Sequence, residues 1–84
     1  MIKMKKNINI AIVGLGQVGI YLYNELKSKK KEIENKTTKK IQLVAISAKN
    51  INKKRKFKID RNIFYKNPLK IFDKNQIDIL FECV

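Results

Sequence analysis

Three glycines between an apolar run and a helical pattern constrain this chain more than any other feature of its sequence. Residues 14–19 read Gly-Leu-Gly-Gln-Val-Gly and follow the apolar residues 8–13. Between a strand and a helix, this spacing is typical of a dinucleotide-binding turn. Gly14 permits a tight turn, Gly16 leaves the backbone open to a pyrophosphate, and Gly19 allows the helix to pack closely on the strand.

The start of the predicted helix supplies further groups for an anion. The first N–H groups of a helix have no partner within it, so they are free to bind phosphate. We predict that the backbone N–H groups of Gln17 and Val18 do so, while the Val18 side chain lies in the core. Val18, Leu22 and Leu26, with Tyr21 beside them, are expected to form a stripe against the sheet. A glycine-rich turn that binds nothing is the alternative.

The rest of the chain alternates between strand and helix patterns. The sequence predicts a helix that ends near Asn35, a strand at 41–47, a loop at 48–58, a short strand at 63–65 and a last strand at 77–84. Strands that alternate with helices favour a parallel sheet. We therefore expect an α/β chain, a partial Rossmann fold whose parallel sheet contains the βαβ first half.

A second, shorter helix is predicted to begin just after Asn67. An asparagine can cap a helix, and Pro68 suits the first helical position because its missing N–H is not needed there. Leu69 and Phe72 are expected to face the sheet from this helix. We expect the whole of residues 1–84 to be one incomplete nucleotide-binding domain, because a doubly wound domain ending there would lack half its sheet.

The composition excludes several classes of protein. The net charge of +13 comes from 20 basic and 7 acidic residues, but only Arg55 and Arg61 are arginines. The excess of Lys, Ile and Asn resembles AT-rich codon usage, so we expect no nucleic-acid partner. One cysteine and no histidine exclude an internal disulfide and a Cys/His metal site, and we expect a reducing cytoplasm. The basic segment 1–6 is not a signal peptide, and no apolar stretch is long enough for a membrane span.

The end of the second predicted strand bears on the choice of cofactor. NAD-binding sites usually place an acidic residue there to bind the ribose 2′-hydroxyl. This chain has Ser47, Ala48 and Lys49 instead, and a hydroxyl with an ammonium favours a 2′-phosphate. We therefore predict NADP, with NAD as the alternative; Lys49 as one more solvated lysine is the competing interpretation. Residues 53–55 are basic and would add to the field around a phosphate.

Three stretches of the chain resemble the amino-terminal segment of homoserine dehydrogenases. Residues 10–19 are similar to that family's first strand and Gly-Leu-Gly-Thr/Gln-Val-Gly turn. Residues 43–50 are similar to its Val-Ala-Val-Ser-Ala-Arg-Asp/Asn, and residues 77–82 to its Asp-Val-Val-Val-Glu strand. The first stretch is shared by many dehydrogenases, whereas the other two together are more specific.

The resemblance implies an oxidoreductase that interconverts L-homoserine and L-aspartate 4-semialdehyde with NAD(P), in threonine and methionine biosynthesis. It implies that residues 14–19 bind the pyrophosphate and that residues 47–49 surround the adenosine ribose, with Lys49 where the family often has an arginine. Catalytic residues would lie beyond this segment, which alone should not catalyse. We expect the full-length protein to take a small-molecule substrate and to form a homo-oligomer.

Two other functions remain open from the sequence. The chain could be the first half of another NAD(P)-dependent dehydrogenase, because the glycine turn is common to many of them. It could also be a nucleotide-sensing Rossmann module without catalysis.

Overall fold

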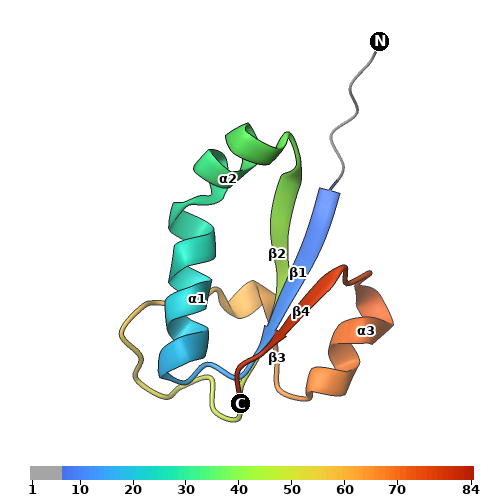
Figure 1. Ribbon diagram of the computed structural model, residues 1–84. Helices are drawn as coiled ribbons and strands as arrows, with labels where there is room; N and C mark the ends of the chain where they lie inside the picture. Colours follow the sequence, from blue (N-terminus) through green and yellow to red (C-terminus); the bar gives the residue numbers. More distant parts are fainter. Residues whose placement is uncertain (1–6) are drawn as a thin grey trace.

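The chain folds into one parallel β-sheet with helices on both faces (Figure 1). The computed structural model describes residues 7–84; the basic segment 1–6 lies outside the described residues. The sheet order is β3-β2-β1-β4, and every neighbouring pair is parallel. This confirms the predicted α/β class. The elements, in chain order, are β1 (Asn7–Val13), α1 (Gln17–Ser28), α2 (Lys30–Thr37), β2 (Lys40–Ser47), η1 (Arg61–Ile63), β3 (Phe64–Tyr65), η2 (Pro68–Lys70), α3 (Ile71–Lys74) and β4 (Ile79–Glu82).

The central strand β1 is apolar on both faces because each face is covered by a helix. On the α1 side, Ile12 packs in one cluster with Tyr23, and both are almost fully buried. On the α3 side, Ala11, Ala45 and Ile71 form a second cluster with no exposed surface. Successive residues of a strand point to opposite faces, so a strand between two helical layers is apolar at nearly every position.

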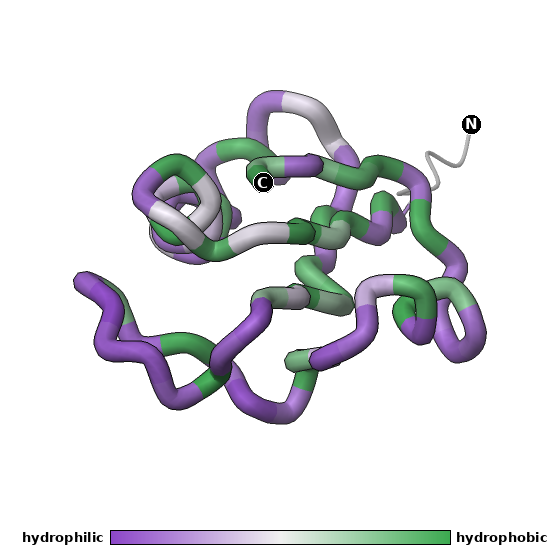
Figure 2. Tube along the Cα trace, turned by 90° about the horizontal axis from the view of Figure 1, so that it is seen from below, coloured by the Kyte–Doolittle hydropathy of each residue, from purple (hydrophilic) through white to green (hydrophobic). Residues whose placement is uncertain are grey.

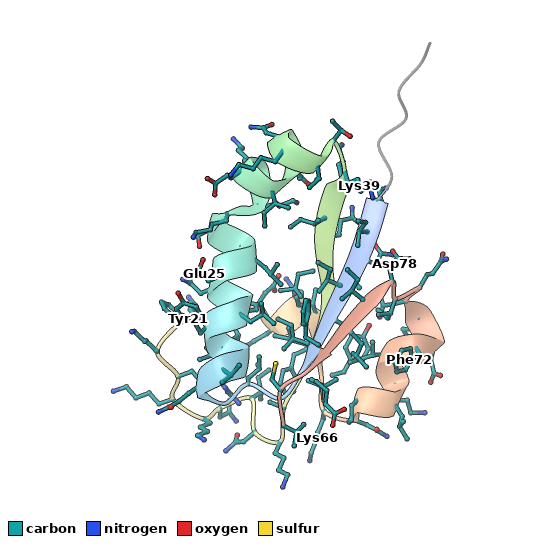
Figure 3. The ribbon with its side chains drawn as sticks, in the orientation of Figure 1. Tyr21, Glu25, Lys39, Lys66, Phe72 and Asp78 are labelled. Carbon is teal, nitrogen blue, oxygen red and sulfur yellow. The ribbon has the colours of Figure 1, made fainter. Side chains whose placement is uncertain are left out.

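Helix α1 turns a different face to the sheet from the one predicted. The prediction that Val18 and Tyr21 face the core is wrong, since they are 72% and 60% exposed, and Tyr21 lies on the outer side of α1 in Figure 3. The buried residues of the helix are Gly19, Ile20 and Tyr23, and the two leucines of the expected stripe are partly buried. The reason is steric: Gly19 must face the glycine turn, and at about 100° per residue this directs Val18 and Tyr21 outward.

The short helix α3 shows a similar shift. Asn67 caps as predicted, since its side-chain oxygen accepts a hydrogen bond from the Leu69 N–H at 3.0 Å. However, Leu69 and Phe72 are 73% and 53% exposed, so the prediction that they face the sheet is wrong, and Ile71 is the buried residue. The first turn is a 3₁₀ turn that begins at Pro68. Because a 3₁₀ turn has three residues rather than 3.6, it rotates the next residues relative to an α-helix.

The predicted first helix is divided in two. Lys29 separates α1 from α2, and its N–H still donates to the Glu25 carbonyl at 3.0 Å. Helix α2 continues past Asn35 and ends at Thr37, and the capping residue Thr38 has a left-handed φ of 57°. The predicted strands are present, although the last pairs only from Ile79 to Glu82. None of the helices in residues 7–84 is long and apolar enough to span a lipid bilayer.

Candidate functional site

The carboxyl ends of three strands meet at one edge of the sheet, at the bottom of Figure 1. The Gly14 N–H donates to the Ser47 carbonyl at 2.7 Å, which joins the ends of β1 and β2. The Cys83 N–H donates to the Val13 carbonyl at 2.7 Å, which joins the ends of β4 and β1. The chain leaves β1 to one side for β2 and β3 and returns on the other side as β4. In open α/β sheets, ligands bind at such a reversal of strand order.

The glycine turn lies at this reversal, and two of its glycines are required by the backbone. Gly14 has a φ of +96°, and a Cβ there would lie 2.8 Å from the carbonyl carbon and oxygen of Cys83. A Cβ on Gly19 would overlap the carbonyl oxygen of Gly14. The predicted turn at Gly14 and the predicted close packing at Gly19 are therefore confirmed.

Gly16 differs from the other two glycines because it is exposed and a side chain added there would enter open space. A Cβ built on it meets no atom within 4 Å, and its φ of −73° suits any residue. Among residues 7–84, no neighbour therefore requires a glycine at this position. A ligand that lies against the backbone would require one, and the predicted approach of a pyrophosphate stays a prediction.

The first turn of α1 presents free N–H groups beside Gly16. The first helical hydrogen bond runs from the Ile20 N–H to the Gly16 carbonyl at 2.9 Å. The N–H groups of Gln17, Val18 and Gly19 precede it and have no acceptor within the helix. No side chain caps this end, and its first turn contains no acidic residue. The partial positive charge of the helix terminus is therefore available to an anion.

A cavity of about 450 Å³ lies in front of the turn and is lined from several segments. Its lining residues are Val13, Gly14, Leu15, Gly16, Ser47, Ala48, Lys49, Asn50, Lys53, Arg55, Lys66, Pro68, Cys83 and Val84. Four of them are cationic and none is acidic. A positively charged cavity of this size is suited to an anionic small molecule.

The predicted ribose-binding residues lie at the edge of this cavity, directly beside the glycine turn. Ser47 is 2% exposed, and its carbonyl accepts the Gly14 N–H. Ala48 is partly buried and Lys49 is exposed. The structure therefore brings the two predicted parts of the site together, although their contact with a ribose stays a prediction.

Two lining residues were not singled out from the sequence. The Arg55 Nε donates to the carbonyl of Leu15 at 3.3 Å, across 40 residues of chain. Lys66 follows β3 and lies at the carboxyl edge of the sheet in Figure 3. Arg55 lies in a run of four basic residues, 53–56, and Lys66 is a single lysine between Tyr65 and Asn67, so neither local pattern points to a site. The one available signal was that Arg55 is one of only two arginines among the 20 basic residues.

A second and wider groove of about 830 Å³ lies between α1 and the loop that follows β2. Figure 2 shows this loop at the lower left, coloured mostly hydrophilic. The groove shares Lys53 and Arg55 with the first cavity, but the glycine turn does not line it. We therefore place the candidate site at the smaller cavity, where the helix terminus and the strand ends meet.

The described residues contain no cluster of three His, Cys, Asp or Glu side chains that would hold a metal ion. Cys83 is a partly buried free thiol at the cavity, and Glu82 is exposed at the end of β4. Within residues 7–84, the glycine turn, the helix terminus and the four cationic lining residues therefore form a cavity suited to an anionic small molecule.

Comparison with solved structures identifies a close structural match for this arrangement. The chain is similar to the crystal structure of S. aureus homoserine dehydrogenase at pH 7.5, with 27% sequence identity and a TM-score of 0.81. That match covers 92% of this chain and 20% of the other. The crystal structure of the same enzyme at pH 8.5 matches with 26% identity and a TM-score of 0.75, over 94% of this chain and 20% of the other. No protein-family model and no curated protein sequence matches the chain.

These matches are to a segment, since the chain spans about a fifth of the length of the solved structures. The segment corresponds to the amino-terminal part of a Rossmann-type dehydrogenase. The resemblance predicted from the glycine turn and the strand motifs is therefore confirmed at the level of three-dimensional structure.

Proposed function

We propose that the chain is the cofactor-binding segment of a homoserine dehydrogenase, and that residues 1–84 are one incomplete NAD(P)-binding domain. The observation that carries the proposal is the glycine turn at the reversal of strand order, within a fold that matches S. aureus homoserine dehydrogenase over 92% of the chain. The whole enzyme would interconvert L-homoserine and L-aspartate 4-semialdehyde in threonine and methionine biosynthesis in the cytoplasm. It would take its small-molecule substrate on parts outside this segment and would form a homo-oligomer.

The residues at the cavity fit a dinucleotide. Gly16 has open space before it, and the N–H groups of Gln17 and Val18 lie at the adjacent helix terminus without an acceptor in the helix. These groups would hold the pyrophosphate, while Ser47 and Lys49, which line the same cavity beside the turn, would hold the ribose. When bound, the nicotinamide supplies hydride transfer. This segment contributes binding and orientation of the dinucleotide.

The same cavity supports a preference for NADP over NAD. No acidic residue lines it, so no carboxylate would bind the 2′-hydroxyl or repel a 2′-phosphate. The Lys49 ammonium is exposed beside the buried Ser47. We propose that Lys49 contributes to binding of the 2′-phosphate, as the predicted NADP preference requires.

Titration of NADPH and NADH against the wild-type chain and Lys49→Glu tests this preference. The new carboxylate should weaken NADPH binding about tenfold or more, because a cation is lost and the phosphate is repelled. The affinity for NADH should be retained. Lys56→Glu is the matched control, because Lys56 is an exposed residue of the same loop that does not line the cavity. Equal weakening of both cofactors, or undiminished NADPH affinity, would contradict the role of Lys49.

The same titration separates the proposal from its alternatives. Failure of the wild-type chain to bind either dinucleotide would remove the proposed cofactor site. If binding holds, assays of homoserine oxidation by the full-length protein distinguish a homoserine dehydrogenase from another dehydrogenase and from a nucleotide sensor without catalysis. Only the first oxidises homoserine, and the last shows no hydride transfer with any substrate.

A further inference from the structure

Arg55 holds the loop after β2 against the glycine turn. Its Nε donates to the Leu15 carbonyl at 3.3 Å. Its Nη1 donates to the carbonyls of Ile51 at 3.4 Å and Lys53 at 3.2 Å. The guanidinium therefore joins the glycine turn to the loop, and three backbone acceptors define its position.

One nitrogen of this guanidinium has no acceptor among residues 7–84. An arginine carries five N–H donors, of which two belong to each terminal nitrogen. Within residues 7–84, the hydrogen bonds of Arg55 involve Nε and Nη1, and none involves Nη2. Arg55 is also partly buried and lines the cavity at the glycine turn. Donors in a partly buried site without a protein acceptor are suited to an anionic ligand.

The other cations of the same loop are held less firmly. Lys49 and Lys53 also line the cavity, but both are exposed and no side-chain hydrogen bond holds either ammonium within the described residues. A long side chain that must be ordered on binding loses conformational entropy, whereas a guanidinium already held in place loses less. Arg55 is thus the cation that the protein has oriented in advance.

We propose that Arg55 is a specificity-determining residue of the cofactor site, whose Nη2 donates to the 2′-phosphate of NADP. The assignment rests on the proposed function, because it requires a dinucleotide in the cavity. The group proposed here, the Arg55 guanidinium, is separate from the Lys49 ammonium. The planar guanidinium matches the oxygens of a phosphate in a way that an ammonium does not.

The two arginines of the chain provide a matched test. Arg55→Met removes the oriented guanidinium, whereas Arg61→Met removes the same charge from a residue that lines the wider groove but not the cavity. We expect Arg55→Met to weaken NADPH about ten- to a hundredfold and NADH less than threefold, as loss of a charged hydrogen bond requires. Arg61→Met should leave the ratio of the two affinities unchanged. An equal loss of both cofactors in Arg55→Met would show that Arg55 only holds the loop, and would overturn the proposal.

A measurement on the wild-type chain does not depend on whether Arg55→Met folds. The side-chain Nε–H groups of the two arginines give two NMR signals, which Arg61→Met assigns. Titration with 2′-AMP should shift the Arg55 signal, and 5′-AMP at equal occupancy should shift it less. An Arg55 signal that saturating 2′-AMP leaves unmoved, in a chain that binds NADPH, overturns the role of Arg55 alone. A chain that binds no dinucleotide instead refutes the proposed function.

Discussion

The turn at 14–19 and the loop at 48–60 meet at one cavity, but they are held in different ways. The turn is determined by backbone atoms, because a side chain at Gly14 or Gly19 would strike the main chain. The loop is held by side chains, chiefly the Arg55 guanidinium and the Tyr23 hydroxyl, which accepts the Asp60 N–H at 2.8 Å. The geometry of the turn therefore depends on the main chain and on two glycines, whereas the position of the loop depends on individual side chains that a substitution can remove.

The largest expected effect breaks the turn. Gly19→Ala should lower the free energy of unfolding by about 3 kcal/mol or more, because the added Cβ overlaps the Gly14 carbonyl oxygen and α1 must move off β1. Gly16→Ala is the matched control, since its Cβ meets no atom within 4 Å. It should cost less than about 1 kcal/mol. Urea denaturation of both variants measures the difference, and equal losses would contradict the packing described for Gly19.

Gly16→Ala also tests whether a pyrophosphate binds against the backbone of the turn. If a pyrophosphate lies against this backbone, the methyl group should weaken both NADPH and NADH without favouring either, because the pyrophosphate is common to the two. This outcome differs from that of Lys49→Glu, which should change their ratio. Titration of the folded variant with both cofactors provides the measurement. Unchanged affinities would show that no ligand approaches Gly16 closely.

A smaller effect is expected where a side chain holds the loop. Tyr23→Phe removes the acceptor of the Asp60 N–H, so we expect a loss of about 1–2 kcal/mol in unfolding free energy. Hydrogen exchange at the Asp60 amide should become faster at the same time. Tyr21→Phe is the control, because Tyr21 is 60% exposed on the outer face of the same helix. If both variants exchange alike, the Tyr23 hydroxyl does not hold the loop.

The smallest expected effect tests the face of α1. Val18→Thr should change the unfolding free energy by less than about 0.5 kcal/mol, because Val18 is 72% exposed. The buried Ile20 provides the comparison, since Ile20→Thr places a hydroxyl in the core and should cost several times more. Thermal denaturation of the two variants measures this difference in stability. A loss at Val18 as large as that at Ile20 would restore the face predicted from the sequence.

The fold was predictable where local patterns and chain stereochemistry agree. The apolar run before Gly14 and the glycine spacing are sufficient to place a strand, a tight turn and a helix in that order. The apolar residues of β1 predicted burial on both faces, and the two core clusters confirm it. The Asn67 cap was likewise a local signal, because the capping bond spans only two residues.

The helix faces were not predictable in the same way. Val18 and Leu69 are apolar residues at plausible helical positions, yet both are exposed. Which side of a short helix is buried depends on what it packs against. For α1 that is the close approach of Gly19 to the turn, and for α3 it is the rotation imposed by a preceding 3₁₀ turn.

In the candidate site, too, some features follow from local sequence and others depend on packing between distant segments. The sequence by itself determined the strand–turn–helix unit around residues 14–19 and the absence of an acidic residue after the second strand. Each of these is a property of adjacent residues. Only the tertiary structure decided that Arg55 reaches Leu15 across 40 residues and that α1 buries Gly19 rather than Val18. Such contacts join segments far apart in the chain, and no local pattern of apolar or charged residues specifies which side chain will reach which carbonyl.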